Sequence, residues 1–204
     1  MKRLTDKNIN SPEEYDRIFF ERAKKEVDEF DLKRWKLLLS YYRKKGRLVD
    51  LGCLDSIAPV LAKDKYPTSE VWGLDQSKEA ISVMSEKYPQ VHWVVGDVYN
   101  TKFPSLYFDY VIVGELLEHL EYPEKFLKEA FRILKKGGYL ALSVPKDETK
   151  GEVDGDRHLW SFSIKDIRNL LDPYGKTKIR LLRSKYFPIY EYHHKNILAF
   201  TSKQ

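Results

Sequence analysis

The stretch Val49-Asp50-Leu51-Gly52-Cys53-Leu54-Asp55-Ser56 decides the fold, because a short apolar run ends there in an acidic residue and a glycine turn. Two later apolar runs also end in an acidic residue, one at Asp75 and one at Asp97. Parallel strands that are buried on both faces are continuous apolar runs, and ligands bind beyond their carboxyl ends. These acidic strand ends therefore predict a nucleoside site along the carboxyl edge of a parallel sheet.

Short runs rich in β-branched or aromatic residues predict five strands, over 48–51, 71–74, 91–95, 110–113 and 139–144. Helical patterns lie between them, over about 57–64, 77–88 and 123–135. After a helix capped by Ser163, two more strand candidates follow without a helix between them, which predicts an antiparallel hairpin. The alternation predicts an α/β fold with a Rossmann-like, doubly wound, seven-stranded, mostly parallel sheet, one antiparallel edge strand and three α/β/α layers.

Two helices are expected ahead of the first strand. The first begins at Ser11-Pro12-Glu13-Glu14, with a capping serine, a proline at the first helical position and a glutamate at the third. Apolar residues at helical spacing continue it to Phe30, and a second helix is expected to end at Gly46. A chain of 204 residues with 42% hydrophobic residues suits a single core, so we expect one domain.

The composition excludes several classes of protein. No run approaches the roughly 20 apolar residues that cross a bilayer, and the basic start of the chain is not followed by an apolar segment, so we expect no membrane partner and no secretion. The only cysteine, Cys53, cannot form an internal disulfide, which fits a cytoplasmic protein. The net charge of +5 is uneven, because residues 157–204 carry ten Lys/Arg against three Asp/Glu. This segment is either a surface for an anionic substrate or nucleic acid or, as we favour, a solvated helix face and strand edge.

Six motifs follow in order: Asp50-Leu51-Gly52-Cys53, Gly73-Leu74-Asp75, Gly96-Asp97-Val98, Phe108-Asp109-Tyr110-Val111-Ile112, Glu115-Leu116-Leu117-Glu118-His119-Leu120 and Arg132-Ile133-Leu134-Lys135-Lys136-Gly137-Gly138-Tyr139-Leu140. Over about 45–201 the chain resembles the class I methyltransferases that use S-adenosylmethionine, particularly the small-substrate and quinone-type enzymes. The resemblance implies transfer of a methyl group to an oxygen or nitrogen of a small molecule. It divides the chain into an N-terminal helical lid (1–45), a cofactor-binding half (46–145) and a substrate-side half (146–204).

The resemblance also assigns parts of the cofactor to particular residues. Asp50 would face the methionine amino group, and the backbone at Gly52 would approach the cofactor closely. Asp75 would accept both ribose hydroxyls, and Asp97 would accept from the adenine amine. The Glu115 backbone would border the methionine end. The full cofactor-binding set implied is Asp50, Gly52, Cys53, Asp55, Asp75, Gln76, Asp97, Val98, Gly114 and Glu115.

The glycine turn departs from the family pattern, which usually has glycines at the positions of Leu54 and Ser56. Leucine tolerates a positive φ poorly, whereas Asp55 can adopt it, so we expect a rearranged turn. Leu54 also argues against a nicotinamide dehydrogenase, whose fingerprint needs a glycine there to approach a pyrophosphate. A non-catalytic relative that serves as a binding module stays open as an alternative.

Methyl transfer requires alignment of acceptor, methyl group and sulfur, and in some reactions the removal of one acceptor proton. His119 and His158 are the candidate catalytic bases, because imidazole titrates close to neutrality. The alternative is that Glu118 and His119 satisfy buried backbone groups and fix a loop.

A metal-dependent alternative uses the same residues. Glu115, Glu118 and His119 have the spacing of one helical face, and His158 is a possible fourth ligand of a divalent metal. This set looks like that of methyltransferases acting on the 3′-terminal 2′-hydroxyl of small RNAs. We favour the small-molecule reading without a metal, since no RNA-binding accessory segment is evident.

Overall fold

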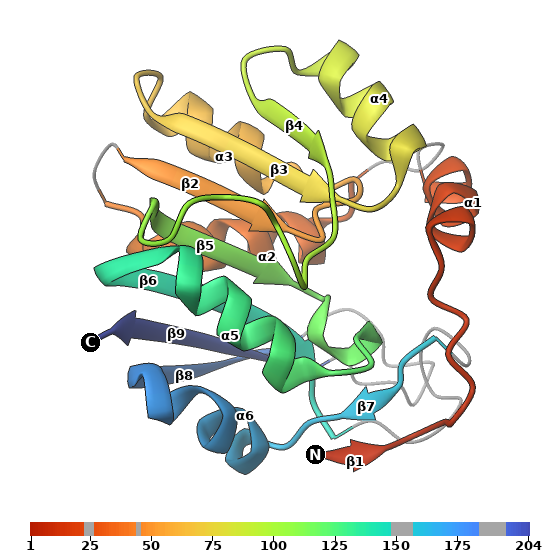
Figure 1. Ribbon diagram of the computed structural model, residues 1–204, viewed down its shortest axis with the longest axis vertical. Coiled ribbons are helices and arrows are strands. Elements are labelled where there is room, and N and C mark those ends of the chain that lie inside the picture. The colour runs from red at the N-terminus through yellow and green to blue at the C-terminus, as the bar shows by residue number, and fades with distance from the viewer. Residues whose placement is uncertain (23–26, 44–45, 148–156, 184–194) are drawn as a thin grey trace.

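The computed structural model describes residues 1–22, 27–43, 46–147, 157–183 and 195–204. Its main sheet has seven strands in the order β4-β3-β2-β5-β6-β9-β8 (Figure 1). These strands are β2 (Arg47–Leu51), β3 (Glu70–Asp75), β4 (His92–Val95), β5 (Phe108–Gly114), β6 (Leu134–Pro145), β8 (Gly175–Arg183) and β9 (Lys195–Lys203). The five strands from β4 to β6 pair in parallel, which confirms the predicted Rossmann-like sheet.

The predicted antiparallel hairpin forms one edge of this sheet. Strand β9 pairs antiparallel with both β6 and β8. The outermost strand is therefore β8, and the strand that runs against the others is its neighbour β9.

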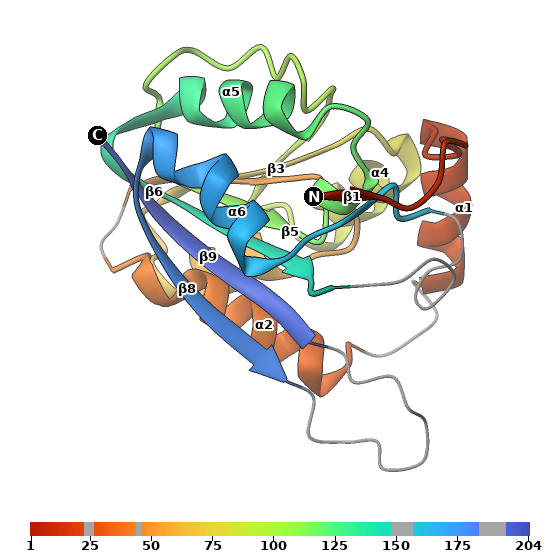
Figure 2. The same ribbon diagram turned by 90° about the horizontal axis from the view of Figure 1, so that it is seen from below.

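Helices cover both faces of the sheet. They are α1 (Pro12–Arg22), α2 (Glu29–Leu38), α3 (Ala58–Lys65), α4 (Lys78–Lys87), α5 (Pro123–Ile133) and α6 (Ile164–Leu171), with single 3-10 turns η1 (Leu39–Tyr41), η2 (Leu117–His119) and η3 (Asp172–Tyr174). Figure 2 shows α5 and α6 on one side of the sheet and α2 on the other. The serine caps explain two of the starts: the Ser77 hydroxyl accepts from the Ala80 amide, and Ser163 forms a capping box with Asp166.

Two apolar layers hold these helices on the sheet, because side chains alternate between its faces along each strand. On β5, Val111 and Val113 belong to the layer beneath α5 and α6. Tyr110 and Ile112 belong to the opposite layer, beneath α2 and α3. All four side chains are buried, so the sheet is covered on both faces and its strands end at an edge that is free to carry a site.

The structure corrects three expectations about element boundaries. The first helix does not reach Phe30, because α2 starts separately at Glu29, where the Asp28 side chain caps it by accepting from the Asp31 amide. The helix expected to 135 ends at Ile133, since β6 already pairs with β5 at Leu134. A short sheet was missed altogether: β1 (Lys2–Arg3) pairs antiparallel with β7 (Trp160–Ser161).

None of the helices in the described ranges is long and apolar enough to cross a membrane.

Candidate functional site

The glycine turn after β2 lies against the end of β3. The amides of Gly52 and Cys53 both donate to the Leu74 carbonyl oxygen, over 2.8 and 3.1 Å. Gly52 has a φ of +70°, and a Cβ atom built on it would lie 2.7 Å from the Leu116 side chain. Glycine is therefore required at this position both for its backbone conformation and for the close approach of Leu116.

Cys53 lies in the turn after β2 and is buried. It is 2% exposed, and its Sγ would lie 3.0 Å from a Cβ on Gly73. Burial raises the pKa of its thiol well above the ordinary value, so the side chain packs as a small neutral group and is not a nucleophile.

The turn is rearranged, but the residue responsible is not the one expected. Leu54 adopts the positive φ, at +39°, and Asp55 does not. The Leu54 amide donates to Asp75 Oδ2 over 2.8 Å, and the Ser56 amide donates to the Cys53 carbonyl oxygen over 2.6 Å. Two hydrogen bonds thus hold the leucine in a conformation that it does not favour by itself.

The Asp75 carboxylate is held by the backbone on both sides. Its Oδ1 accepts from the Ser77 amide over 2.9 Å, while Oδ2 accepts from Leu54. Burial raises the pKa of this carboxyl group, and the amides that donate to it oppose the rise. Each oxygen keeps a further lone pair, so the group can still accept two ribose hydroxyls.

Asp50 lies near the end of β2, and its environment perturbs it strongly. It is 2% exposed, and its Oδ2 finds no hydrogen-bond partner in the part of the chain that the structure describes. Burial raises its pKa to about 7, and the nearby Asp75 charge adds to the rise. A buried carboxylate oxygen without a partner is costly, so this position suits a ligand that brings its own donor.

The other predicted cofactor residues lie at neighbouring strand ends. Asp97 is exposed beyond β4, where its Oδ1 accepts from the Tyr99 amide over 2.8 Å. Val98 packs its half-buried side chain against the core, and Gln76 and Asp55 are also half-buried. These residues follow β2, β3 and β4, so the structure brings the predicted set to one sheet edge.

Glu115 follows Gly114 at the end of β5, and its side chain contacts α2 and β9. It has a φ of +53°, and its Oε1 lies 3.0 Å from Arg34 Nη1 and accepts from Asn196 Nδ2 over 2.7 Å. Arg34 is a nearly buried residue of α2 that also pairs with Asp31. The side chain of Glu115 therefore fixes α2 and β9 at this end of the sheet, and its backbone stays beside Gly114 as expected.

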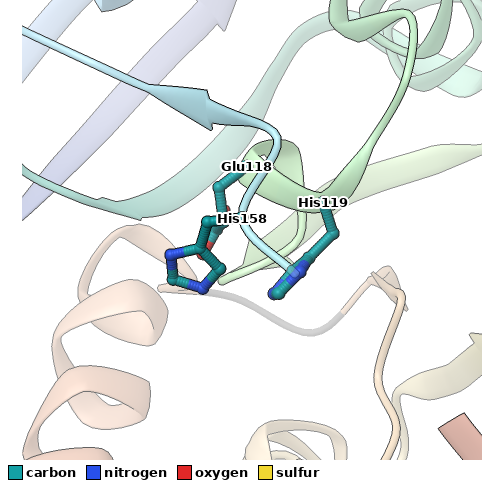
Figure 3. Close-up of side chains that lie close together, drawn as sticks. All are labelled: Glu118, His119 and His158. Carbon is teal, nitrogen blue, oxygen red and sulfur yellow. The ribbon is translucent and has the colours of Figure 1, made fainter. Parts of the chain in front are cut away.

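Three other side chains form a compact group just after the end of β5. The ligand atoms of Glu118, His119 and His158 all lie within 4.8 Å of one another (Figure 3). The two imidazole rings lie edge to face with centroids 4.7 Å apart. Glu115 is not part of the group, and His119 lies on the 3-10 turn η2 and not on an α-helix. The alternative set of four metal ligands on one helical face is therefore not formed, while the candidate bases His119 and His158 lie next to each other.

The N-terminal segment holds this group in place. Asn10 Nδ2 donates to the carbonyl oxygens of His119 and Arg157, over 3.2 and 2.9 Å. The Tyr15 ring packs edge-on against His119, with centroids 6.0 Å apart. Farther along α1, Asp16 accepts from the Ser77 hydroxyl next to Asp75. Figure 1 shows α1 beside α4, so the first 22 residues extend from β7 to the end of β3, where Asp75 lies.

Sequence reasoning missed Arg34, Asn10 and Asn196. Arg34 follows the inner face of a predicted amphipathic helix, where a basic residue next to Trp35 could have signalled a buried ion pair. Asn10 and Asn196 carry no such local signal, because their partners lie more than 80 residues away in the sequence.

Known proteins with similar sequences are methyltransferases. A family model described as a methyltransferase domain matches residues 49–142. An uncharacterized methyltransferase of Schizosaccharomyces pombe is 32% identical over 114 residues, 50% of this chain and 41% of the relative. A demethylmenaquinone methyltransferase of Lysinibacillus sphaericus is 34% identical over 110 residues, 52% of this chain and 46% of the relative. The chain thus spans less than half the length of these curated relatives.

A solved structure shows that the fold extends over nearly the whole chain. The 1,6-didemethyltoxoflavin-N1-methyltransferase of Burkholderia thailandensis, solved with S-adenosylhomocysteine, has a TM-score of 0.70 at 14% identity. The match covers 98% of this chain and 94% of that one. Over residues 49–142 the chain thus matches the methyltransferase domain, and over nearly its whole length it has the fold of S-adenosylmethionine-dependent methyltransferases.

Proposed function

We propose that this protein transfers a methyl group from S-adenosylmethionine to an oxygen or nitrogen of a small-molecule acceptor. The observation that carries the proposal is the buried Asp50 Oδ2, which has no hydrogen-bond partner among the described residues. The methionine end of the cofactor carries an ammonium group, which would supply the missing donor and the compensating charge. A nucleotide cofactor without such an ammonium would leave this atom unsatisfied.

The remaining cofactor contacts follow from the sheet edge. Asp75 would accept the ribose hydroxyls through the lone pairs that its backbone donors leave over. Exposed Asp97 would accept from the adenine amine, with the Val98 amide as a donor to the ring. The bound sulfonium supplies the electrophilic methyl group, so the protein has to align the acceptor and exclude water.

The acceptor would lie near Glu118, His119 and His158. Either imidazole could take a proton from the acceptor, since His119 lies on η2 just after β5 and His158 lies next to it. The N-terminal segment would act as the lid over this region, because Asn10 and Tyr15 contact His119. Two of the proteins described above are named for small-molecule acceptors, demethylmenaquinone and 1,6-didemethyltoxoflavin, which favours a small molecule here too.

Titration calorimetry with S-adenosylhomocysteine tests the cofactor site. We expect saturable binding by the natural chain and a loss of about tenfold or more in affinity in Asp75→Asn, because charge-assisted hydrogen bonds to the ribose are lost. Asp64→Asn is the matched control, since Asp64 is an exposed residue of α3. Absence of binding by the natural, folded chain would refute the proposal.

Turnover separates an enzyme from a binding module. The chain would be incubated with S-adenosylmethionine carrying a labelled methyl group and a panel of phenols, carboxylic acids and amines. Labelled product that requires the chain supports the enzyme. Tight binding of S-adenosylhomocysteine, with no product from any acceptor class, would favour the non-catalytic binding module instead.

A further inference from the structure

We propose that Glu118, His119 and His158 form a binding site for one divalent transition-metal ion, such as Zn²⁺ or Co²⁺. Their ligand atoms lie within 4.8 Å of one another, and they come from two segments of the chain. Glu118 and His119 lie on η2, and His158 precedes β7 (Figure 3). Modest side-chain rotations would bring the three atoms to the roughly 2 Å bond lengths of such an ion.

The ligand types select the class of metal. Two imidazoles and one carboxylate suit first-row transition ions, whereas Mg²⁺ and Ca²⁺ prefer oxygen ligands. Only one of the three groups here offers oxygen. The site is therefore expected to prefer Zn²⁺ or Co²⁺ over Mg²⁺, which separates it from the four-ligand alternative that included Glu115.

The backbone around the three ligands is fixed before any ion binds. The Leu159 amide donates to the Glu118 carbonyl oxygen over 2.7 Å, which joins the two segments directly. Asn10 bridges them a second time by donating to the carbonyl oxygens of His119 and Arg157. A site whose ligands are held on connected segments loses little conformational entropy when it binds an ion.

The hydrogen bond of His119 indicates which of its nitrogen atoms would bind the ion. Its Nδ1 lies 3.3 Å from the Arg157 carbonyl oxygen, and a carbonyl can only accept. The proton is therefore assigned to Nδ1, so Nε2 is the nitrogen atom that would bind a metal. Metal-bound histidines are commonly oriented in this way, by donating their other ring nitrogen to a carbonyl group.

Burial strengthens the case for an ion of charge +2 at this place. Glu118 is fully buried and His158 is 6% exposed, so water contributes little to the solvation of a carboxylate charge there. A metal ion would compensate that charge, and three protein ligands would leave a coordination position open. Resting on the proposed function, an acceptor oxygen could occupy that position and lose its proton more easily, and the two histidines would then act as ligands in place of a base.

Metal binding can be measured without any methyl transfer. The chain without a histidine tag would be treated with chelator, dialysed and titrated with Co²⁺, following visible absorption and heat. We expect one Co²⁺ per chain and a loss of affinity of about tenfold or more in His119→Ala and in His158→Ala. His92→Ala, which removes an exposed imidazole on β4, is the matched control and should leave the affinity unchanged.

Asn10→Ala keeps all three ligands and tests the site even if a ligand variant fails to fold. We expect this variant to bind Co²⁺ about tenfold more weakly, because it removes the bridge between the two segments. Circular dichroism and thermal unfolding would verify that each variant is folded. No saturable binding by the natural chain, or equal affinity in the natural chain and both folded histidine variants, would overturn the proposal.

The same experiments distinguish this proposal from the proposed function. If S-adenosylhomocysteine binds in the presence of chelator and Co²⁺ does not bind, the metal site is refuted and the cofactor site stands. If Co²⁺ binds with the expected dependence on His119 and His158 and the nucleoside does not bind, the metal site stands alone.

Discussion

Replacing Gly52 by alanine should destabilise the protein more than the same change at Gly137. The two glycines have nearly equal φ angles, +70° and +73°. The left-handed conformation costs a residue with a Cβ roughly 1–2 kcal/mol, and this part is common to both variants. At Gly137 a Cβ meets nothing within 4 Å, whereas at Gly52 it meets the Leu116 side chain at 2.7 Å.

The difference between the variants measures the steric conflict with Leu116. Overpacking of this kind costs about 1–3 kcal/mol, so Gly52→Ala should lower the free energy of unfolding by about 2–5 kcal/mol and Gly137→Ala by about 1–2 kcal/mol. Leu116→Ala removes the conflicting atoms. The double variant Gly52→Ala/Leu116→Ala should therefore be more stable than the sum of the single changes predicts, by about 1–3 kcal/mol.

Urea unfolding at equilibrium, analysed by linear extrapolation, gives these free energies. Unchanged slopes would show that the variants alter stability and not the surface exposed on unfolding. Equal losses in the two glycine variants, or strict additivity in the cycle with Leu116→Ala, would refute the close packing between the glycine turn and Leu116.

Three further predictions concern charges and a helix cap. Burial raises the pKa of Asp50 to about 7, so between about pH 4 and pH 7 the folded chain retains a proton that the unfolded chain releases. The free energy of unfolding should therefore fall as the pH rises from about 4 to 7. Urea titrations at several pH values should show a smaller fall in Asp50→Asn. Arg34→Ala should lower the free energy of unfolding by about 2–4 kcal/mol, because it leaves Glu115, with 26% of its side chain exposed, without its cation. Arg17→Ala, which removes an exposed ion pair, should lower it by less than about 1 kcal/mol. Equal losses in the two variants would contradict the ion pair between Arg34 and Glu115. Ser163→Ala should cost about 1 kcal/mol in thermal unfolding, since it removes one half of the capping box of α6, and no change would contradict that role.

Sequence patterns predicted the sheet well because its strands are buried on both faces. A run such as Tyr110 to Val113 stays apolar only where helices cover both faces of the sheet. The capping residues Ser77 and Ser163 predicted where two of the helices begin. The acidic strand ends could be found for the same reason, since each interrupts an apolar run. The meeting of these acidic residues at one edge of the sheet was therefore predictable from local sequence.

The parts that escaped prediction depend on contacts between distant segments. The pairing of β1 with β7 involves only two residues on each strand, too few for a periodic signal. The positive φ falls on Leu54, because its amide reaches Asp75, 21 residues later, and propensity alone favoured Asp55. In the same way, Glu115 lies outside the group of Glu118, His119 and His158, because Arg34 and Asn196 bind its carboxylate.

The two main-chain amides that donate to the Asp75 carboxylate should raise its affinity for a nucleoside. A side chain that is already immobilised has few rotamers left to surrender when a nucleoside docks, so more of the interaction energy appears as binding. Since one of the two amides belongs to Leu54, the unusual leucine also restricts the carboxylate that is proposed to bind the sugar.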